Sequence, residues 1–103
     1  MVVNPLRSKA FGTWEVINNF NANGNTWTAP SDGFLFIKFS LGGASDVYVY
    51  ASQGALPVAT IACKGATGGY SLTTHVPVYE GQSFTMYTNQ TSGINSYFMA
   101  IGE

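Results

Sequence analysis

The sequence is built from short segments that alternate apolar and polar residues, separated by turn residues about every ten positions. No segment carries the i, i+3, i+4, i+7 apolar spacing of an amphipathic helix. The 12 glycines, several of them in pairs, interrupt any stretch long enough to be helical. We therefore expect an all-β protein, folded as an antiparallel two-sheet jelly-roll sandwich of about eight strands.

The expected strands fill a chain of 103 residues, a length that fits a single jelly-roll domain, 1–103. Within it, residues 1–25 should hold the N-terminal strand and a hairpin closed by Asn23-Gly24, a pair that supplies positive φ. Residues 26–103 should form the core of the sandwich. The expected strands cover residues 13–18, 26–29, 33–41, 46–51, 57–63, 70–78, 83–88 and 94–101.

Charged residues are scarce and shape which partners we expect. They make up 9% of the chain, against about 25% in typical domains, so much of the surface is covered by Asn, Ser, Thr, Gly and Tyr or hidden against other chains. The basic residues do not cluster, and nucleic-acid binding is not expected. No apolar run reaches the ~18 residues of a membrane span, and residues 1–11 lack the apolar core and cleavage site of a signal peptide.

Two of the expected strands are apolar on both faces. In residues 33–41 one alternate set is wholly apolar, and the other contains Phe34 and Phe36. Strands of this kind usually lie between two layers, but a sandwich leaves one face of each sheet outside. We expect another copy of the chain to cover that face, with a loop or the N-terminal segment as the alternative. The expected interface residues are Phe34, Phe36, Tyr97, Met99 and Ile101.

Catalytic and metal sites are not expected. The only His and the only Cys, His75 and Cys63, fall on different expected strands, and Asp32, Asp46 and Glu80 lie beside turns, where carboxylates commonly form turns. A three-fold axis could bring copies of His75 together, although a hydrogen-bonded strand residue is the simpler interpretation. Neither a Gly-x-Ser-x-Gly elbow nor P-loop spacing is present, so we expect no enzyme activity and no cofactor.

Binding groups are what remain. Aromatic rings stack on sugars, and mixtures of Tyr with Ser, Gly and Asn serve adaptable recognition, although each Tyr can equally be a cross-strand packing residue. Because binding residues concentrate in loops on rigid scaffolds, we expect contact from loops 42–46, 64–70 and 89–95. The expected ligand-binding residues are Lys64, Thr67, Tyr70, Asn89, Gln90 and Asn95.

Four stretches taken in order resemble the trimeric jelly-roll heads of the tumour necrosis factor superfamily, and more closely the globular head of the complement subcomponent with collagen-like stalks. They span about residues 26–103 and read "WTAPSDGFLFIKFSL", "DVYVYASQG", "THVPVYEGQSFTMYT" and "INSYFMAIGE". Short loops and the absence of an acidic calcium-binding cluster make the chain look most like heads of bacteriophage fibres and related virion proteins. The resemblance implies a homotrimer with the terminal strand near the three-fold axis, and it carries over no ligand residue.

The expected function is a non-enzymatic trimeric binding head, such as a phage or viral fibre tip that recognises a host-surface glycan or another receptor. Such a head would lie on a virion or extracellular surface and could join a fibre shaft. The alternatives are a structural virion decoration or fibre-trimerisation module without its own ligand, and a secreted bacterial adhesion module.

Overall fold

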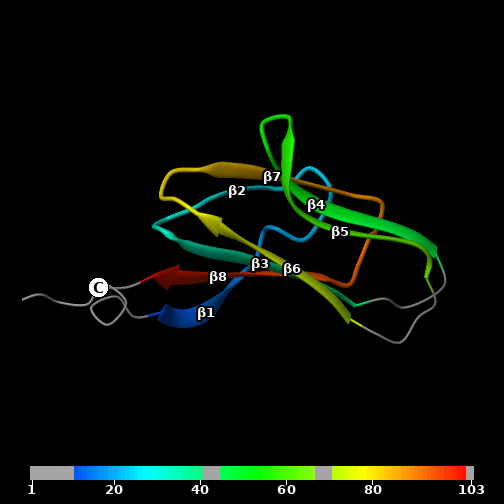
Figure 1. The fold of residues 1–103 in the computed structure, drawn as a ribbon, viewed down its shortest axis with the longest axis horizontal. Coiled ribbons are helices and arrows are strands. Elements are labelled where there is room, and N and C mark those ends of the chain that lie inside the picture. Colours follow the sequence, from blue (N-terminus) through cyan, green and yellow to red (C-terminus); the bar gives the residue numbers. More distant parts are fainter. Residues whose placement is uncertain (1–10, 41–44, 67–70, 102–103) are drawn as a thin grey trace, which may run out of the picture.

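Eight β-strands form the regular structure of the chain (Figure 1), in a computed structural model that describes residues 11–40, 45–66 and 71–101. None of these residues is helical, so the described chain contains no helix able to cross a membrane. The expectation of an all-β protein is confirmed. The strands are β1 (Phe11–Ile17), β2 (Thr26–Thr28), β3 (Gly33–Ser40), β4 (Ser45–Gln53), β5 (Leu56–Ala66), β6 (Ser71–Val78), β7 (Ser83–Thr88) and β8 (Ile94–Ile101).

The strands form two four-stranded antiparallel sheets. One has the order β1-β8-β3-β6 and is called here the β8/β3 sheet; the other, with the order β2-β7-β4-β5, is the β7/β4 sheet. The chain changes sheet at every connection except that between β4 and β5, which is a hairpin. This is the strand order of a jelly roll, and the expected architecture is confirmed. Figure 1 shows the β8/β3 sheet below the β7/β4 sheet.

The core lies between the sheets and follows from the alternation of side chains along each strand. In β3, Leu35, Ile37 and Phe39 are buried, while the residues between them are only half-buried. The β7/β4 sheet contributes alternate residues in the same way, including Val49 and Met86. Each such side chain gains about 1.5–3 kcal/mol on burial, so the alternation itself holds the two sheets together.

The segment between β1 and β2 carries Phe20 into this core, where it is fully buried. Its ring lies 6.2 Å from the ring of Trp27, which packs half-buried against the core. Gly24 adopts the expected positive φ of 86°. The expected hairpin is wrong, however, because β1 pairs with β8 and β2 pairs with β7. The segment between β1 and β2 instead crosses from one sheet to the other, and this crossing places Phe20 in the space between the sheets.

The hairpin of β4 and β5 is longer than the sequence suggested. Its ladder continues to the pair Ser45 and Ala66, so β5 does not end at Cys63. Lys64 therefore lies in a strand, and its assignment to a loop was wrong because the ladder continues beyond the apolar run. At the other end β4 extends to Gln53, and Gly54 turns the chain with a φ of 63°.

Ser96 provides a test of how the crossing segment is held. Its buried hydroxyl donates a hydrogen bond to the backbone carbonyl oxygen of Phe20. Ser96→Ala should lower the free energy of unfolding by about 1–3 kcal/mol, because the buried carbonyl loses this donor. Urea unfolding at one fixed protein concentration measures the loss. The control is Ser83→Ala, which removes an exposed hydroxyl 2.8 Å from that of Thr28 and should change stability by less than about 0.5 kcal/mol. Equal losses in the two variants would contradict the role given to Ser96.

Candidate functional site

The outer side of the β8/β3 sheet carries a continuous apolar surface, which we call the aromatic face. Strand register places Tyr97 beside Phe36 and Met99 beside Phe34, while β1 adds Trp14 beside Met99. Trp14 is 46% exposed, and the others are half-buried. Every expected interface residue lies on this surface, so the two-sided apolar character of β3 and β8 is confirmed. The aromatic face consists of Trp14, Phe34, Phe36, Tyr97, Met99 and Ile101.

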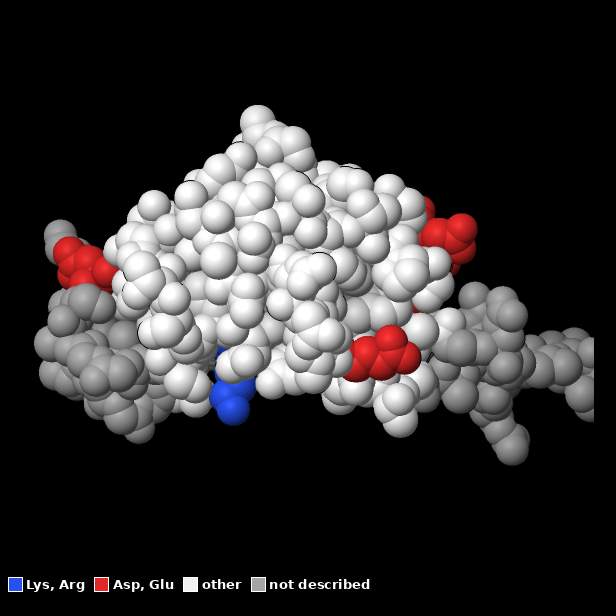
Figure 2. All heavy atoms as spheres, turned by 180° about the vertical axis from the view of Figure 1, so that it is seen from behind, with Lys and Arg blue, Asp and Glu red and all other residues white. Residues whose placement is uncertain are grey.

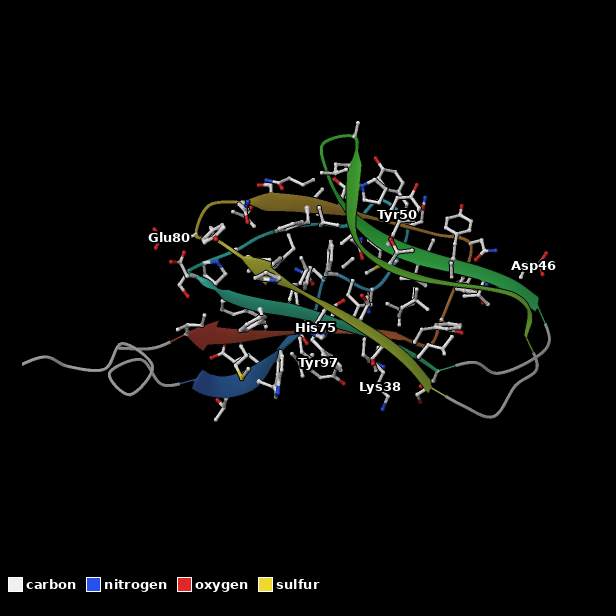
Figure 3. All side chains as sticks on the ribbon, viewed as in Figure 1. Lys38, Asp46, Tyr50, His75, Glu80 and Tyr97 are labelled. Atoms are coloured by element: carbon white, nitrogen blue, oxygen red, sulfur yellow. The ribbon has the colours of Figure 1, made fainter. Side chains whose placement is uncertain are left out.

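Phe36 lies at the centre of the aromatic face. Its ring centroid is 5.2 Å from that of Trp14 and 6.0 Å from that of Tyr97, with the ring planes inclined by 54° and 62°. Such tilted and edge-to-face pairs contribute about 0.5–1.5 kcal/mol each beyond the area they bury. Figure 3 shows Tyr97 and Lys38 extending from this sheet, away from the β7/β4 sheet. The rings therefore form one pre-arranged cluster on the outside of the molecule.

Two shallow hollows on the aromatic face remain open on either side of Phe36. One, of about 420 Å³, is lined by Trp14, Phe36, Lys38, Thr73 and Tyr97. The other, of about 260 Å³, is lined by Trp14, Phe34, Phe36, His75 and Met99. Trp14 thus covers Phe36 only in part. The segment 1–10, which could cover this face instead of a second copy, falls outside the described residues.

Titratable side chains do not gather into a site in the part of the chain that the structure describes. No group of three or more His, Cys, Asp or Glu residues there is placed to hold a metal ion. His75 is exposed at the middle of β6, with its ring 6.4 Å from that of Phe34. Asp32 Oδ1 accepts a hydrogen bond from the backbone N–H of Glu80 at 2.9 Å, which fits the expected role of a turn carboxylate. A His75 site on a three-fold axis stays a prediction.

The outer side of the β7/β4 sheet carries a row of tyrosines, which we call the tyrosine face: Tyr48, Tyr50 and Tyr87. Tyr50 lies opposite Tyr87 in the ladder, with ring centroids 5.3 Å apart, and its ring is 5.9 Å from that of Tyr48. Tyr48 and Tyr87 are 42% and 39% exposed. Figure 3 shows Tyr50 on the opposite side of the molecule from Lys38.

Few charged residues lie in the strands of the β7/β4 sheet. Asp46, at the far end of β4, is the only charged residue among the described side chains of these strands, and Lys64 of β5 falls outside them. Figure 2, which views the molecule from behind, shows charged groups at the two ends and along the lower edge, with the remaining surface white. Hydroxyl residues lie beside the tyrosines: Thr60 is opposite Tyr50 in the ladder, and Thr85 precedes Tyr87 by two positions on β7.

The loop residues expected to bind a ligand have mixed outcomes. Asn89 follows β7 as expected, but its side chain holds backbone: Oδ1 accepts from Tyr48 N–H at 3.1 Å, and Nδ2 donates to the carbonyl of Asp46 at 2.8 Å. Gln90 Nε2 donates to Asn89 Oδ1 at 2.9 Å. Asn95 was wrongly assigned to a loop, because it is an exposed residue of β8, opposite Lys38. Thr67, Tyr70 and the side chain of Lys64 lie outside what the structure describes.

The sequence alone did not identify the two features that organise these faces. Trp14 joins the aromatic face only because β1 pairs with β8 in a register that sets it beside Met99. Tyr87 joins Tyr50 only because β7 pairs with β4. The usable signal was the alternation of Tyr48 and Tyr50 with valines that the structure buries, because alternate residues of a strand lie on opposite faces.

Comparisons with known proteins find only loose structural likeness. No protein-family model and no curated protein matches the sequence. Similar solved structures include a Podospora anserina GH26-CBM35 β-(1,4)-mannanase (9% identity, 85% of this chain and 22% of that chain, TM-score 0.42). They also include a carbohydrate-binding module of Cellvibrio mixtus lichenase 5A in complex with cellotriose (19% identity, 92% of this chain and 88% of that chain, TM-score 0.38). A third is CsCBM6-3 from Clostridium stercorarium in complex with cellobiose (11% identity, 98% of this chain and 85% of that chain, TM-score 0.38). The chain thus spans only about a fifth of the mannanase, and its own strand order, not these likenesses, defines the jelly roll.

Proposed function

We propose that the protein is a non-enzymatic binding head that works as a homotrimer, with the aromatic face buried between copies and the tyrosine face directed outward. The observation that carries this proposal is the contrast between the outer sides of the two sheets. One is a continuous apolar surface with open hollows, and the other carries tyrosines with hydroxyl side chains beside them.

The aromatic face supports self-association because its exposure is costly for a lone chain. Each large aromatic side chain that stays in water forgoes about 1.5–3 kcal/mol of burial. Monomeric proteins rarely expose continuous apolar patches beyond a few hundred Å² unless the patch serves an interaction. Lys38 carries the only formal charge at pH 7 among the described outward side chains of β3, β6 and β8, so little charge would be desolvated in the contact. The resemblance of residues 26–103 to trimeric heads favours three copies.

The remaining part of the proposal concerns what the head does. Burying the aromatic face leaves the tyrosine face exposed to a ligand, as on a fibre tip that recognises a glycan or another receptor on a host surface. A virion decoration or fibre-trimerisation module would use the same contact between copies, but it would have no ligand on the tyrosine face. Binding of the purified trimer to host cells therefore distinguishes these two functions.

Light scattering of the purified chain tests the assembly. We expect a molar mass three times that of the 11.0 kDa chain at micromolar concentration. The midpoint of thermal unfolding should also rise with protein concentration, because association and folding are then linked. A species of 11.0 kDa whose melting does not depend on concentration would contradict the proposal.

A further inference from the structure

We infer that His75 makes the proposed assembly sensitive to acid. Copies associate through the aromatic face while the imidazole of His75 is neutral, and they separate when it takes up a proton. The inference rests on the proposed function and concerns the regulation of the same surface. It requires a contact between copies, but it does not depend on their number.

His75 lies at the border of the aromatic face. It is exposed on β6 and stands opposite Phe36 in the ladder, so its side chain is on the outer side of the sheet. Its ring centroid is 6.4 Å from that of Phe34, with the ring planes inclined by 63°. The hollow of about 260 Å³ is lined by His75 together with Trp14, Phe34, Phe36 and Met99. A second copy that fills this hollow therefore removes water from His75 as well.

The described groups that face His75 offer no partner for a positive charge. On β3 the only titratable neighbour on the outer side is Lys38, which is itself a cation, two residues from Phe36. On β8 it is Tyr97, whose phenol carries no charge and which lies opposite Phe36. The other outward neighbours on β1 and β6 do not titrate: Trp14, Val16, Thr73 and Pro77.

The acidic residues nearest in the sequence to the strands of this sheet are directed elsewhere. Glu15 stands opposite Phe98 in the ladder, and Phe98 is buried between the sheets, so Glu15 is on the inner side of β1. Asp32 lies before β3, where its Oδ1 accepts a hydrogen bond from the backbone N–H of Glu80 at 2.9 Å. Neither carboxylate is therefore placed to pair with a cation at the centre of β6.

The remaining charges do not change this balance. Figure 3 shows Glu80 and Asp46 at opposite ends of the molecule, with His75 between them. One acidic residue of the chain, Glu103, falls outside the described residues. Three basic residues have side chains outside them: Arg7, Lys9 and Lys64. A protonated His75 is thus more often faced with like charge than with a carboxylate.

The two forms of His75 consequently differ in how readily they are buried. A neutral imidazole can lie against an apolar surface, whereas an imidazolium would lose its water without gaining an anion. In separate copies the ring stays in water, where the charged form is tolerated. The assembly therefore binds fewer protons than the separate copies. Association should weaken as the pH falls through the range from about 8 to 5, in which histidine takes up its proton.

The general charge of the chain predicts the opposite trend. The net charge is −1 at pH 7 and the pI is about 5.6, so repulsion between copies is smallest in mild acid. Proteins near zero net charge tend to associate. Dissociation in mild acid would therefore indicate a specific titrating group and not the overall charge.

The first experiment measures association of the wild-type chain by sedimentation equilibrium at constant ionic strength, between about pH 8 and about pH 5.5. We expect the association constant to fall at least about tenfold per copy over this range, the effect of one pH unit of differential proton binding. Circular dichroism at the same pH values shows whether the β-structure is retained, so that separation of folded copies is distinguished from unfolding.

The second experiment uses three variants of this position. His75→Gln keeps a neutral polar side chain, so association should stay strong and should no longer depend on pH. His75→Arg carries a permanent charge and should associate weakly at both ends of the range. The matched control adds Thr60→His to the His75→Gln chain. It places a histidine on an exposed position of the tyrosine face and should not restore the dependence on pH.

The outcomes separate this inference from the proposed assembly. Association that stays constant or strengthens in acid would overturn the inference and leave the assembly intact. A dependence on pH that persists in His75→Gln would assign it to another group and would also overturn the inference. A wild-type chain that is monomeric at every pH would overturn the assembly and the inference with it.

Discussion

Phe36→Asp is expected to convert the proposed trimer into a folded monomer of 11.0 kDa. Each copy would lose the burial of one Phe, about 1.5–3 kcal/mol, which corresponds to roughly tenfold to over a hundredfold in association per copy. The new carboxylate adds the cost of burying a charge beside the rings of Trp14 and Tyr97. Light scattering gives the mass, and far-ultraviolet circular dichroism shows whether the β-structure is retained.

Two further variants keep this test specific. Trp14→Ser changes a residue that is already 46% exposed at an edge strand, so it should weaken association with little loss of monomer stability. Thr60→Asp places the same charge on an exposed position of the tyrosine face and should leave the mass unchanged. A Phe36→Asp protein that keeps its trimeric mass would show that the aromatic face is not the contact. Loss of assembly in Thr60→Asp as well would point to a general effect of added charge.

Strand positions could be predicted from the sequence because the side-chain period of a strand is local. The alternation in β3 places Leu35 and Ile37 inside and Phe36 outside whatever the neighbouring strands are. Strand partners are not local, and β1 and β8 pair although they stand at opposite ends of the chain. Turn residues did not supply this information, since Asn23-Gly24 suits a hairpin and also the crossing between sheets that the chain actually makes.

The same distinction explains which parts of the site were visible. The aromatic face was largely predictable, because Phe34, Phe36 and Met99 are outward by period alone. The tyrosine face required the pairing of β7 with β4, which the sequence did not reveal. The role of Asn89 was hidden for a chemical reason: an amide near a loop can face a ligand or hold backbone equally well, and only the position of Tyr48 decides between them.

Gly33 is a position where a single added methyl group should cost much stability. It begins β3 in the middle of the β8/β3 sheet, paired with Val78 on one side and Ala100 on the other. A Cβ at this position would overlap the carbonyl oxygen of Met99 and would lie 2.8 Å from Phe98 Cε1. The obstacle includes backbone of β8, which cannot move away without breaking its pairing with both β1 and β3.

Gly33→Ala should therefore cost about 3 kcal/mol or more, at the upper end of overpacking effects and a large share of the stability of a small domain. Gly54→Ala separates this steric cause from backbone conformation. Gly54 has a φ of 63° but nothing within 4 Å of an added Cβ, so only the left-handed conformation opposes the change, at about 1 kcal/mol. Urea unfolding followed by tryptophan fluorescence compares the two. If Gly33→Ala were no more destabilising than Gly54→Ala, the close approach of β3 and β8 at Gly33 would not constrain the fold. The requirement for glycine at that end of the sheet would then not help to fix the register that sets Phe36 beside Tyr97.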